Sequence, residues 1–467
     1  MDYECTQKTR RSHQKRISVK NIVFFYIFFC LFFCINSSAA IKKQERLLSL
    51  QDAIHLSLRE NPNVKNVKLT ETLQRFNVQT EEWRFRPHFS LSANASSDRI
   101  AAAPEVSYLS PIGTDIKITP NSINSQHADS HVTFKVSQPL MRGFGRAIVE
   151  AALYDARDSE KMAQLNIEGS IRTTITNVIN AYLDVVAAEK NIEIDEAALE
   201  RAVQSVKQTD IFIKSGRKAG NELITVKANV ANARSSLENS KNALSQTRYA
   251  MLNAIGLDPN EEFHFSELNI QALIKKYDVL SVEQVKKLAV QNDIQYQTDV
   301  ITLHGVTTRS LMLAEDRSRS SLSLDLEHQQ YDSASLSLTI PIDDQAAKQS
   351  VLAAKIALQQ ANINLKAAKW SKEVNAINNW KTVTASKRSL LFAEDAAHLQ
   401  EKTYQMSYQK YLHGLIDSLE LQTAQFQLIQ AQHALLSAQI SYLKSLVNLD
   451  LLVGHTLKTW NIDARLG

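Results

Sequence analysis

Four short segments of the chain alternate apolar and polar residues with a period of two. In the first of them, Phe89, Leu91 and Ala93 share one side of the chain. Sustained alternation of this kind predicts a β-strand with one apolar face. The segments are residues 88–96, 131–140, 320–329 and 333–342. They occur in two pairs, one in each half of the chain, so we expect two pairs of strands.

The rest of the chain contains long stretches without helix breakers. From Asp343 to His413 there is no glycine or proline. A helix of about 70 residues would be roughly 105 Å long at a rise of 1.5 Å per residue. A matching stretch runs from about Arg146 to Lys214 and contains a single glycine, Gly169. Both stretches predict helices too long for an ordinary globular core.

Each long helical stretch is followed by a glycine and then by a second helical stretch. Gly216 and Gly414 therefore predict turns after which the chain returns alongside the preceding helix. Gly256 and Gly454 follow the returning stretches, where glycine commonly terminates a helix.

The same order of predicted elements occurs twice along the chain, which indicates an internal repeat. "SLQDAIHLSLREN" at 49–61 is similar to "SVEQVKKLAVQND" at 281–293. Pro139 and Pro341 occupy matching positions at a strand-to-helix transition, because proline ends a strand ladder and suits the start of a helix. The segment 99–130, which contains three prolines, is expected to be a long loop between the first two strands.

These boundaries divide the chain into five parts. We expect a signal peptide at 1–40, a first repeat at 41–257, an equatorial segment at 258–280, a second repeat at 281–454 and a tail at 455–467.

The first 40 residues resemble a secretory signal more than a membrane anchor. A basic stretch precedes the apolar run "IVFFYIFFCLFFCI" at 22–35, and "SSAA" follows it. A lipoprotein signal is disfavoured, because Phe32 and Phe33 precede Cys34 where small residues are required. All three cysteines lie in this segment, as do six of the 53 basic and two of the 49 acidic residues. The remaining chain would have 47 of each and no thiol, which argues against nucleic-acid binding.

Four strands are too few to close a barrel within one chain. Strands of about ten alternating residues are long enough to cross an outer membrane, and lipid tolerates no open sheet edge. Three chains could pool their strands into a closed barrel of twelve. A soluble sheet packed on helices would show the same alternation. The alanine-rich helices with polar opposite faces fit either a solid bundle or a water-filled helical tube.

The order and duplication of these segments resemble the TolC-like outer membrane efflux family. The resemblance extends from about Ser49 to Gly454, and its most specific parts are "SLQDAIHLSLRENPNV", "VSQPLMRGFGR" and the glycine turns. It implies a mainly α-helical fold with membrane β-strands, in which a trimer forms a twelve-stranded barrel. That barrel would continue into a long coiled-coil α-helical barrel in the periplasm. It also implies a periplasmic adaptor and an inner-membrane transporter as partners.

The resemblance assigns roles to residues near the two glycine turns. Gly216 and Gly414 would lie at the periplasmic tips, and Glu222 and Glu420, each six positions further on, would line the pore constriction. A ring of carboxylates in a narrow aperture attracts cations. The same glutamates are also favoured simply as residues at the start of a helix.

The second tip departs from the family pattern. Thr423 stands where a second acidic residue is familiar, and Ile416 stands where some relatives have arginine. In the first tip, Lys214, Arg217 and Lys218 could form a basic surface for an adaptor or an ordinary solvated loop.

The sequence contains no nucleotide-binding glycine loop, no catalytic motif and no histidines at metal-ligand spacing. We therefore expect a channel without enzymatic activity or cofactor, located in the outer membrane of a Gram-negative cell and extending into the periplasm. An exported, pore-free coiled-coil protein is the alternative. The sequence does not indicate whether the substrate is a small molecule or a secreted protein.

Overall fold

The computed structural model describes residues 46–95, 100–120, 132–261, 263–266, 268–277, 280–329 and 331–463. The predicted signal peptide and its cysteines lie outside the described residues, as does part of the predicted loop 99–130. One small unit is the parallel pair of β1 (Arg46–Leu48) and β6 (Phe263–Phe265). All other described elements belong to a second unit, to which the following paragraphs refer.

Helices make up most of the second unit. They are α2 (Leu50–Glu60), α3 (Pro62–Trp83), α4 (Arg146–Val149), α5 (Ala151–Lys214), α6 (Glu222–Ile255), α7 (Ile270–Ile274), α8 (Val282–Gln291), α9 (Ile294–Thr302), the π-helical η1 (Leu303–Thr307), α10 (Thr308–Arg317), α11 (Gln345–Leu412), α12 (Ser418–Val453) and α13 (Thr456–Trp460). The predicted long helices are confirmed, since α5 has 64 residues and α11 has 68. Within the described ranges, no helix is both long enough and apolar enough to cross a membrane.

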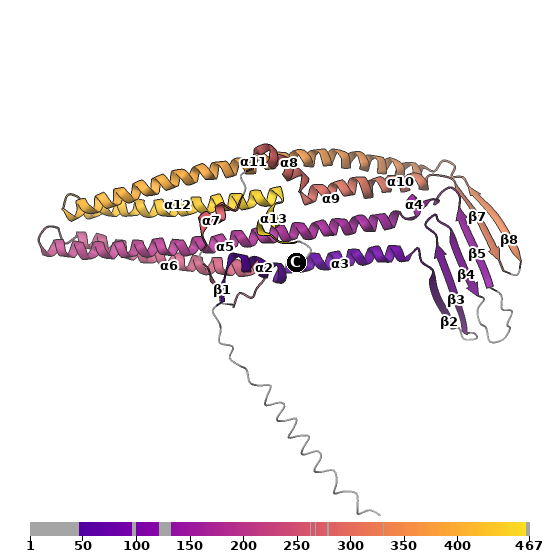
Figure 1. Cartoon of the computed structure of the whole chain (residues 1–467), viewed down its shortest axis with the longest axis horizontal. Helices are drawn as coiled ribbons and strands as arrows, with labels where there is room; N and C mark the ends of the chain where they lie inside the picture. Colours follow the sequence, from indigo (N-terminus) through magenta and orange to yellow (C-terminus); the bar gives the residue numbers. More distant parts are fainter. Residues whose placement is uncertain are drawn as a thin grey trace, which may run out of the picture. The chain divides into compact units, whose positions relative to one another are not determined.

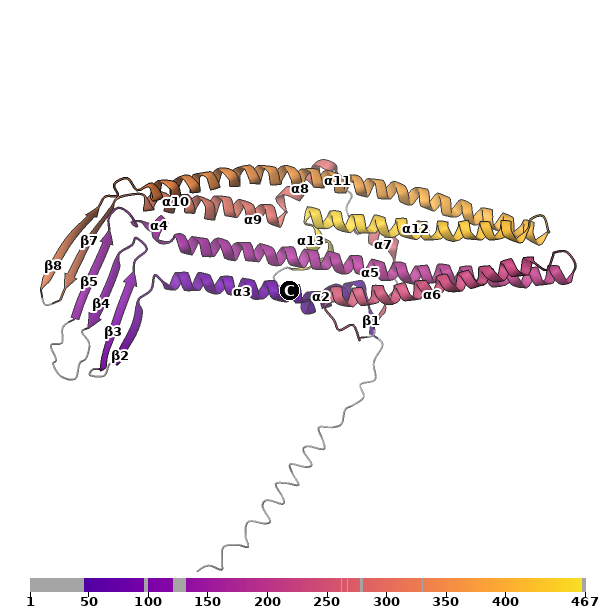
Figure 2. The ribbon, with the colours of Figure 1, turned by 180° about the vertical axis from the view of Figure 1, so that it is seen from behind.

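The long helices lie side by side, with the sheet at one end and the two glycine turns at the other (Figures 1 and 2). Helix α6 packs against α5, and α12 packs against α11. Helix α12 also packs against α5, which joins the two helix pairs. The most deeply buried part of the core is the middle of α5, where Ile175, Ile179 and Leu183 are inaccessible to solvent. Burying such side chains stabilises the bundle by roughly 1.5–3 kcal/mol each.

Both returning helices end in the same way. Gly256 and Gly454 adopt left-handed conformations with φ of +92° and +75°. A Cβ at Gly256 would lie 2.9 Å from the backbone of Asn61, so the short helices pack closely against these ends. The side chain of Asn61 donates to the carbonyl of Ala254, and that of Asn292 donates to the carbonyl of Val453. Each asparagine thus satisfies a carbonyl that the end of a helix leaves unpaired.

The main sheet has six strands rather than the four that the sequence predicted. They are β2 (His88–Ala95), β3 (Ile100–Leu109), β4 (Asp115–Pro120), β5 (Val132–Pro139), β7 (Ser321–His328) and β8 (Asp332–Thr339), adjacent in that order and all antiparallel. The four predicted strands correspond to β2, β5, β7 and β8. Strands β3 and β4 occupy the segment predicted as a loop, so that prediction is wrong for residues 100–120.

The two additional strands were not predicted because their segment contains three prolines. Proline lacks an amide donor and usually excludes a central strand. Here Pro104 lies beyond the part of β3 that pairs with β4, which is Val106 to Leu109. Pro111 lies in the turn between the strands, and Pro120 is the last residue of β4. Pro104 and Pro120 each take part in only one of the two ladders of their strand, with β2 and with β5 respectively, and Pro111 takes part in neither.

The pairing register places most apolar residues on one side of the sheet and most polar residues on the other. For example, Val106 pairs with Ile118, and Ile116 pairs with Val136. Exceptions include Leu109, which lies on the polar side, and Gln138 and His328, which lie on the apolar side. The apolar face includes Phe89, Leu91, Ala93, Ala102, Pro104, Val106, Tyr108, Ile116, Ile118, Pro120, Val132, Phe134, Val136, Leu322, Leu324, Leu326, Ala334, Leu336 and Leu338. The polar face includes Ser90, Ser92, Glu105, Ser107, Asp115, Lys117, Thr119, Thr133, Lys135, Ser137, Ser323, Asp325, Glu327, Ser333, Ser335, Ser337 and Thr339.

Four of the six strands connect to helices. Helix α3 leads into β2, β5 into α4, α10 into β7, and β8 into α11. Pro139 is the last residue of β5, and Pro341 lies two residues beyond β8. Neither proline stands in the first turn of the following helix, because α4 begins at Arg146 and α11 at Gln345. The buried carboxylate of Asp316 accepts a hydrogen bond of 3.0 Å from the amide of Gly143, which ties α10 to the end of β5.

The β3–β4 turn gives a test of the strand-to-helix junction. Gly113 has a φ of +98°, and a Cβ there would lie 2.9 Å from the carbonyl oxygen of Gly143. Gly143 also has a positive φ, +81°, but a Cβ there meets nothing within 4 Å. We expect Gly143→Ala to lower the free energy of unfolding by about 1–2 kcal/mol and Gly113→Ala by at least about 1 kcal/mol more. Thermal unfolding in detergent would measure both, and equal losses would contradict the close approach.

Candidate functional site

The candidate site is the pair of tips at which the long helices turn. Gly216 and Gly414 have φ values of +71° and +73°, a conformation that glycine adopts without strain. In the first tip, the amide of Arg217 donates to the carbonyl of Phe212 over 2.8 Å. In the second, the amide of Leu415 donates to the carbonyl of Lys410 over 2.9 Å. Both long helices therefore end in a Schellman motif, and both glycines stand at the turns where the sequence placed them.

The two predicted constriction residues have different surroundings. Glu222 is the first residue of α6, and Glu420 lies in the first turn of α12. The carboxylate of Glu222 accepts a hydrogen bond of 2.8 Å from the ammonium of Lys218 and is partly buried, with 23% of the side chain exposed. Glu420 is exposed, and its amide donates to the capping carboxylate of Asp417. Asp417, considered as a possible substitute for missing latch residues, thus has a structural role as the N-cap of α12.

The charge of Glu222 is stabilised by its neighbours. Burial of the carboxylate opposes its ionisation, but hydrogen bonds from Lys218 and Ser418 outweigh this effect, so the pKa of Glu222 lies below its usual value of 4.5. Ser418 belongs to the second tip, so Glu222 links the two tips within one chain. We therefore expect Glu222 to remain ionised at neutral pH.

Lys218 is not available for a basic docking surface. Its side chain is only 7% exposed. Its ammonium lies 4.2 Å from the centre of the Tyr411 ring and 3.5 Å from the carbonyl oxygen of Ile416. Lys214, which is exposed, is paired with Asp210 at 2.6 Å. The structure therefore uses two of the three predicted surface cations in contacts within the chain.

A buried hydrogen bond joins the two helix pairs near their tips. The hydroxyls of Thr209 on α5 and Tyr411 on α11 are 2.6 Å apart, and both residues are inaccessible to solvent. Because the Thr209 hydroxyl already donates to the carbonyl of Ser205, Tyr411 is the donor to Thr209. The ring of Phe212 packs edge-on against that of Tyr411 at 5.6 Å, and Leu421 completes the cluster.

Further polar contacts continue along α5 away from the tips. We call the following contacts the polar seam: Asn180–Asn448 (3.4 Å), Asp184–Lys444 (2.6 Å), Asn191–His433 (2.7 Å), Ser205–Gln425 (3.0 Å) and Thr209–Tyr411 (2.6 Å). Water can replace such partners more readily than it can solvate an apolar core. The polar seam therefore joins the helix pairs by contacts that can be exchanged on separation.

The sequence matches a family profile described as outer membrane efflux protein over residues 53–257 and 310–455. These ranges comprise most of the chain, and they include both tips and all six strands of the main sheet. The chain belongs to the outer membrane efflux protein family. The resemblance inferred from the sequence is thereby confirmed.

Solved structures share the fold of this family member at low sequence identity. The open-state MtrE outer membrane channel of Neisseria gonorrhoeae is 16% identical, with a TM-score of 0.67, and the match covers 87% of this chain and 88% of that one. The CmeC outer membrane channel of Campylobacter jejuni is 14% identical, with a TM-score of 0.64 and 90% of each chain covered. VceC, an outer membrane protein of Vibrio cholerae, is 15% identical, with a TM-score of 0.62, and 87% and 95% of the two chains are covered. No curated protein sequence matches this chain.

Sequence reasoning missed the residues that hold the tips of this family member together. Tyr404, Tyr408 and Tyr411 are spaced as i, i+4 and i+7, which places them on one face of a helix and could have indicated a contact surface. Nothing in the sequence around Thr209 or Ser418 distinguishes these residues from other helical hydroxyls. Among the described residues, no cluster of three or more histidine, aspartate or glutamate side chains could hold a metal ion.

We expect the first tip to loosen in acid. A carboxylate whose pKa is lowered in the folded state stabilises the fold above its usual pKa, and this stabilisation is lost as the pH falls through the folded-state pKa. The amides of residues 216–222 should therefore be less protected at about pH 3 than at about pH 6, after correction for intrinsic exchange. Hydrogen exchange would measure this difference. Glu222→Gln should abolish it, and Glu420→Gln should leave it unchanged.

Removing the Tyr411 hydroxyl should loosen the contact between the tips without unfolding the helices. Tyr411→Phe keeps the ring packing and leaves Thr209 bonded to Ser205, so a loss of about 0.5–1.5 kcal/mol is expected. Hydrogen exchange near residues 209 and 411 should then be about 2- to 10-fold faster. Tyr442→Phe, near the opposite end of α12, is the matched control. A similar acceleration at the tips in that control would contradict a local role for Tyr411.

Proposed function

We propose that the protein is the exit duct of a tripartite efflux pump or of a type I secretion system. In this proposal it resides in the outer membrane of a Gram-negative cell and extends into the periplasm. Small molecules or unfolded proteins pass through it from the periplasmic side to the exterior.

One observation carries this proposal, namely the sheet's exposed apolar face between two open edges. Phe89 is 81% exposed, Leu336 is 65% exposed and Leu338 is 58% exposed. Among the described residues, β2 and β8 each have a strand neighbour on one side only. In water such a face and such edges would promote aggregation, and in lipid an open edge would leave backbone groups without partners. Closure with other copies of the chain resolves both problems.

The proposed assembly is a trimer, as the family resemblance implies. Strand β8 of one copy would pair with β2 of the next, so that the apolar face meets lipid and the polar face lines the lumen. The long helices would continue the duct, with their glycine turns at the periplasmic end. At a rise of 1.5 Å per residue, α11 alone is about 100 Å long.

The proposal includes a periplasmic adaptor and an inner-membrane transporter as partners. The sequence offers no nucleotide-binding motif, so the energy for transport would come from the transporter. The tips are the parts of this chain farthest from the sheet along the helices (Figure 1). They are therefore the surfaces we assign to contact with the partners.

The constriction is assigned to Glu222 and Glu420. Since Glu222 is already paired with Lys218, whereas Glu420 is exposed, the two carboxylates would not contribute equally. Three copies of Glu420 would supply most of the attraction for cations at the aperture.

Conductance across planar bilayers tests the duct and its constriction together. We expect discrete, cation-selective channels from the trimeric protein, because unpaired carboxylates at a narrow aperture favour cations. Selectivity should fall in Glu420→Gln, fall less in Glu222→Gln and be lowest in the double variant. Glu394→Gln is the matched control, since Glu394 is an exposed glutamate of α11 about 30 Å from Gly414 along the helix.

The possible outcomes separate the parts of the proposal. If channels form and their ion selectivity is unchanged by both substitutions, the protein is a duct but the two glutamates do not line its constriction. Absence of channels from protein shown to be folded and trimeric would favour the alternative, an exported coiled-coil protein without a pore.

A further inference from the structure

The β3–β4 hairpin distinguishes this sheet from the four-stranded arrangement that the family resemblance implied. It is fully integrated into the sheet. Strand β3 pairs with β2 along eight consecutive residues, from Ile100 to Ser107. Strand β4 pairs with β5 along all six of its residues. The hairpin therefore separates β2 from β5, which would otherwise be the natural neighbours at this point of the sheet.

The side chains of the hairpin follow the two faces of the other strands. Val106, Tyr108, Ile116 and Ile118 belong to the apolar face, and Glu105 and Lys117 belong to the polar face. A soluble extension beyond the membrane would have no reason to keep an apolar stripe in register with its neighbours. Such registration is required when every strand crosses the same lipid layer.

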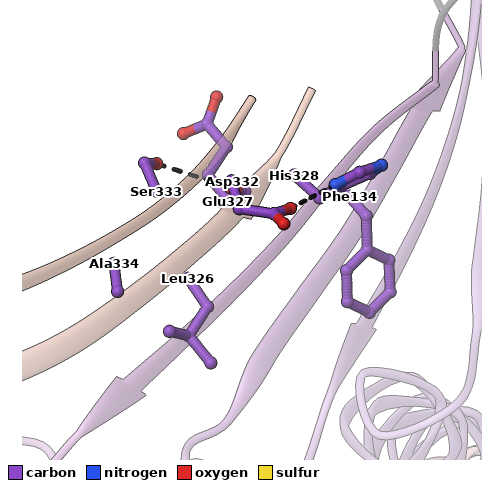
Figure 3. Close-up of a pocket in the computed structure, with 7 residues that line it drawn as sticks. All are labelled: Phe134, Leu326, Glu327, His328, Asp332, Ser333 and Ala334. Atoms are coloured by element: carbon purple, nitrogen blue, oxygen red, sulfur yellow. Dashed lines mark hydrogen bonds and ion pairs between the residues drawn. The ribbon is translucent and has the colours of Figure 1, made fainter. Parts of the chain in front are cut away.

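The apolar face also extends toward the opposite end of the strands. Phe134 of β5 and Leu326 of β7 line a shallow hollow there and project from neighbouring strands, near the ion pair of His328 with Asp332 (Figure 3). Both apolar side chains are about two-fifths exposed, at 41% and 42%. The hollow is also lined by Glu327, His328, Asp332 and Ser333, so the apolar face ends here in polar residues.

The turn of the hairpin is anchored at the helical end of the sheet. The amide of Gly145, next to α4, donates to the carbonyl of Ile112 over 3.2 Å. The hydroxyl of Thr114 donates to the side-chain oxygen of Gln138 on β5. Gly113 is buried against Gly143, Pro139 and Val149. The turn of the hairpin thus lies at the level at which β5 ends. The ten residues of β3 are enough to cross a membrane, and β4 has six described residues beside it.

We propose that β3 and β4 are membrane-spanning strands, so that a closed trimeric barrel of this protein has eighteen strands. The inference rests on the proposed function, because it assumes that three chains close one barrel. Each chain contributes the six strands of its sheet, and three chains contribute eighteen.

An eighteen-stranded barrel has a wide lumen. Barrel diameter grows roughly linearly with strand number, so the barrel would be about one and a half times as wide as one of twelve strands, and barrels of 16–18 strands enclose an aqueous channel. Only four strands per chain continue into helices, so β3 and β4 add to the circumference of the barrel without adding a helix to the tunnel. The barrel would therefore not select solutes by size, and selection would take place at the helical tips.

The competing arrangement places the hairpin outside the membrane and lets β2 pair directly with β5. The two arrangements predict different neighbours. In the observed sheet, Lys117 and Lys135 are register partners, which suits a disulfide between cysteines at these positions. Ser90 and Thr133 are three strands apart, about 14 Å, which is too far for a disulfide.

Disulfide formation in the full chain tests the strand order. All three native cysteines lie in the first 34 residues, so the strands offer a cysteine-free background. We expect Lys117→Cys/Lys135→Cys to oxidise to an intrachain disulfide, detected by peptide mapping, and Ser90→Cys/Thr133→Cys to remain reduced. A β2–β5 disulfide in the second variant would overturn the proposal.

Labelling of reconstituted protein with a charged, membrane-impermeant maleimide tests whether the hairpin spans the lipid. Lys117→Cys should react from the lumen at least about tenfold faster than Ile116→Cys, because lipid excludes a charged reagent. Equal, fast labelling at both positions would overturn the proposal. Ser337→Cys and Leu338→Cys on β8 are the controls. If labelling rates alternate between neighbouring positions on β8 but not on β4, the proposal that β3 and β4 span the membrane is wrong. If labelling rates do not alternate on β8 either, the membrane barrel itself is contradicted.

Discussion

The unpaired edges of the six-stranded sheet are the constraint on which the rest of this structure depends. Each edge strand carries amide and carbonyl groups that require partners, and within the described part of the chain β2 and β8 each have a neighbouring strand on one side only. The exposed apolar face removes the option of solvating the sheet in water. A closed assembly of several copies, as proposed above, would satisfy the edges and would place the apolar face against lipid.

The helical part combines two kinds of contact. The middle of α5 is held by fully buried aliphatic side chains, which resist opening because separation would expose apolar surface. Toward the tips, polar pairs such as Ser205–Gln425 and Thr209–Tyr411 join the two helix pairs. Water can take the place of these partners. The bundle thus combines an apolar core around the middle of α5 with polar contacts that lie closer to the glycine turns.

Several features of the fold could be predicted from local sequence patterns. The absence of helix breakers predicted α5 and α11, and the glycines that follow them predicted both tip turns, because positive φ values favour glycine. Alternation predicted the ends of β2, β5, β7 and β8 to within three residues. Strands β3 and β4 were missed because Pro104 and Pro120 lie within them and Pro111 lies in the turn between them. Whether a proline interrupts a ladder depends on the neighbouring strand, which the sequence alone does not identify.

The candidate site likewise combines features that local sequence determines with features that depend on tertiary packing. The sequence by itself determined which residues stand at the turns and at the starts of the returning helices, since these follow from local backbone preferences. Only the tertiary structure decided that Lys218 is buried over Tyr411, that Glu222 is paired while Glu420 is exposed, and that Thr209 meets Tyr411 across two helix pairs. The contacts of Lys218 and Thr209 with Tyr411 join residues about 200 positions apart and depend on how the long helices pack, which no local pattern specifies. The pair of Lys218 with Glu222 is local, at i and i+4, but its burial depends on the same packing.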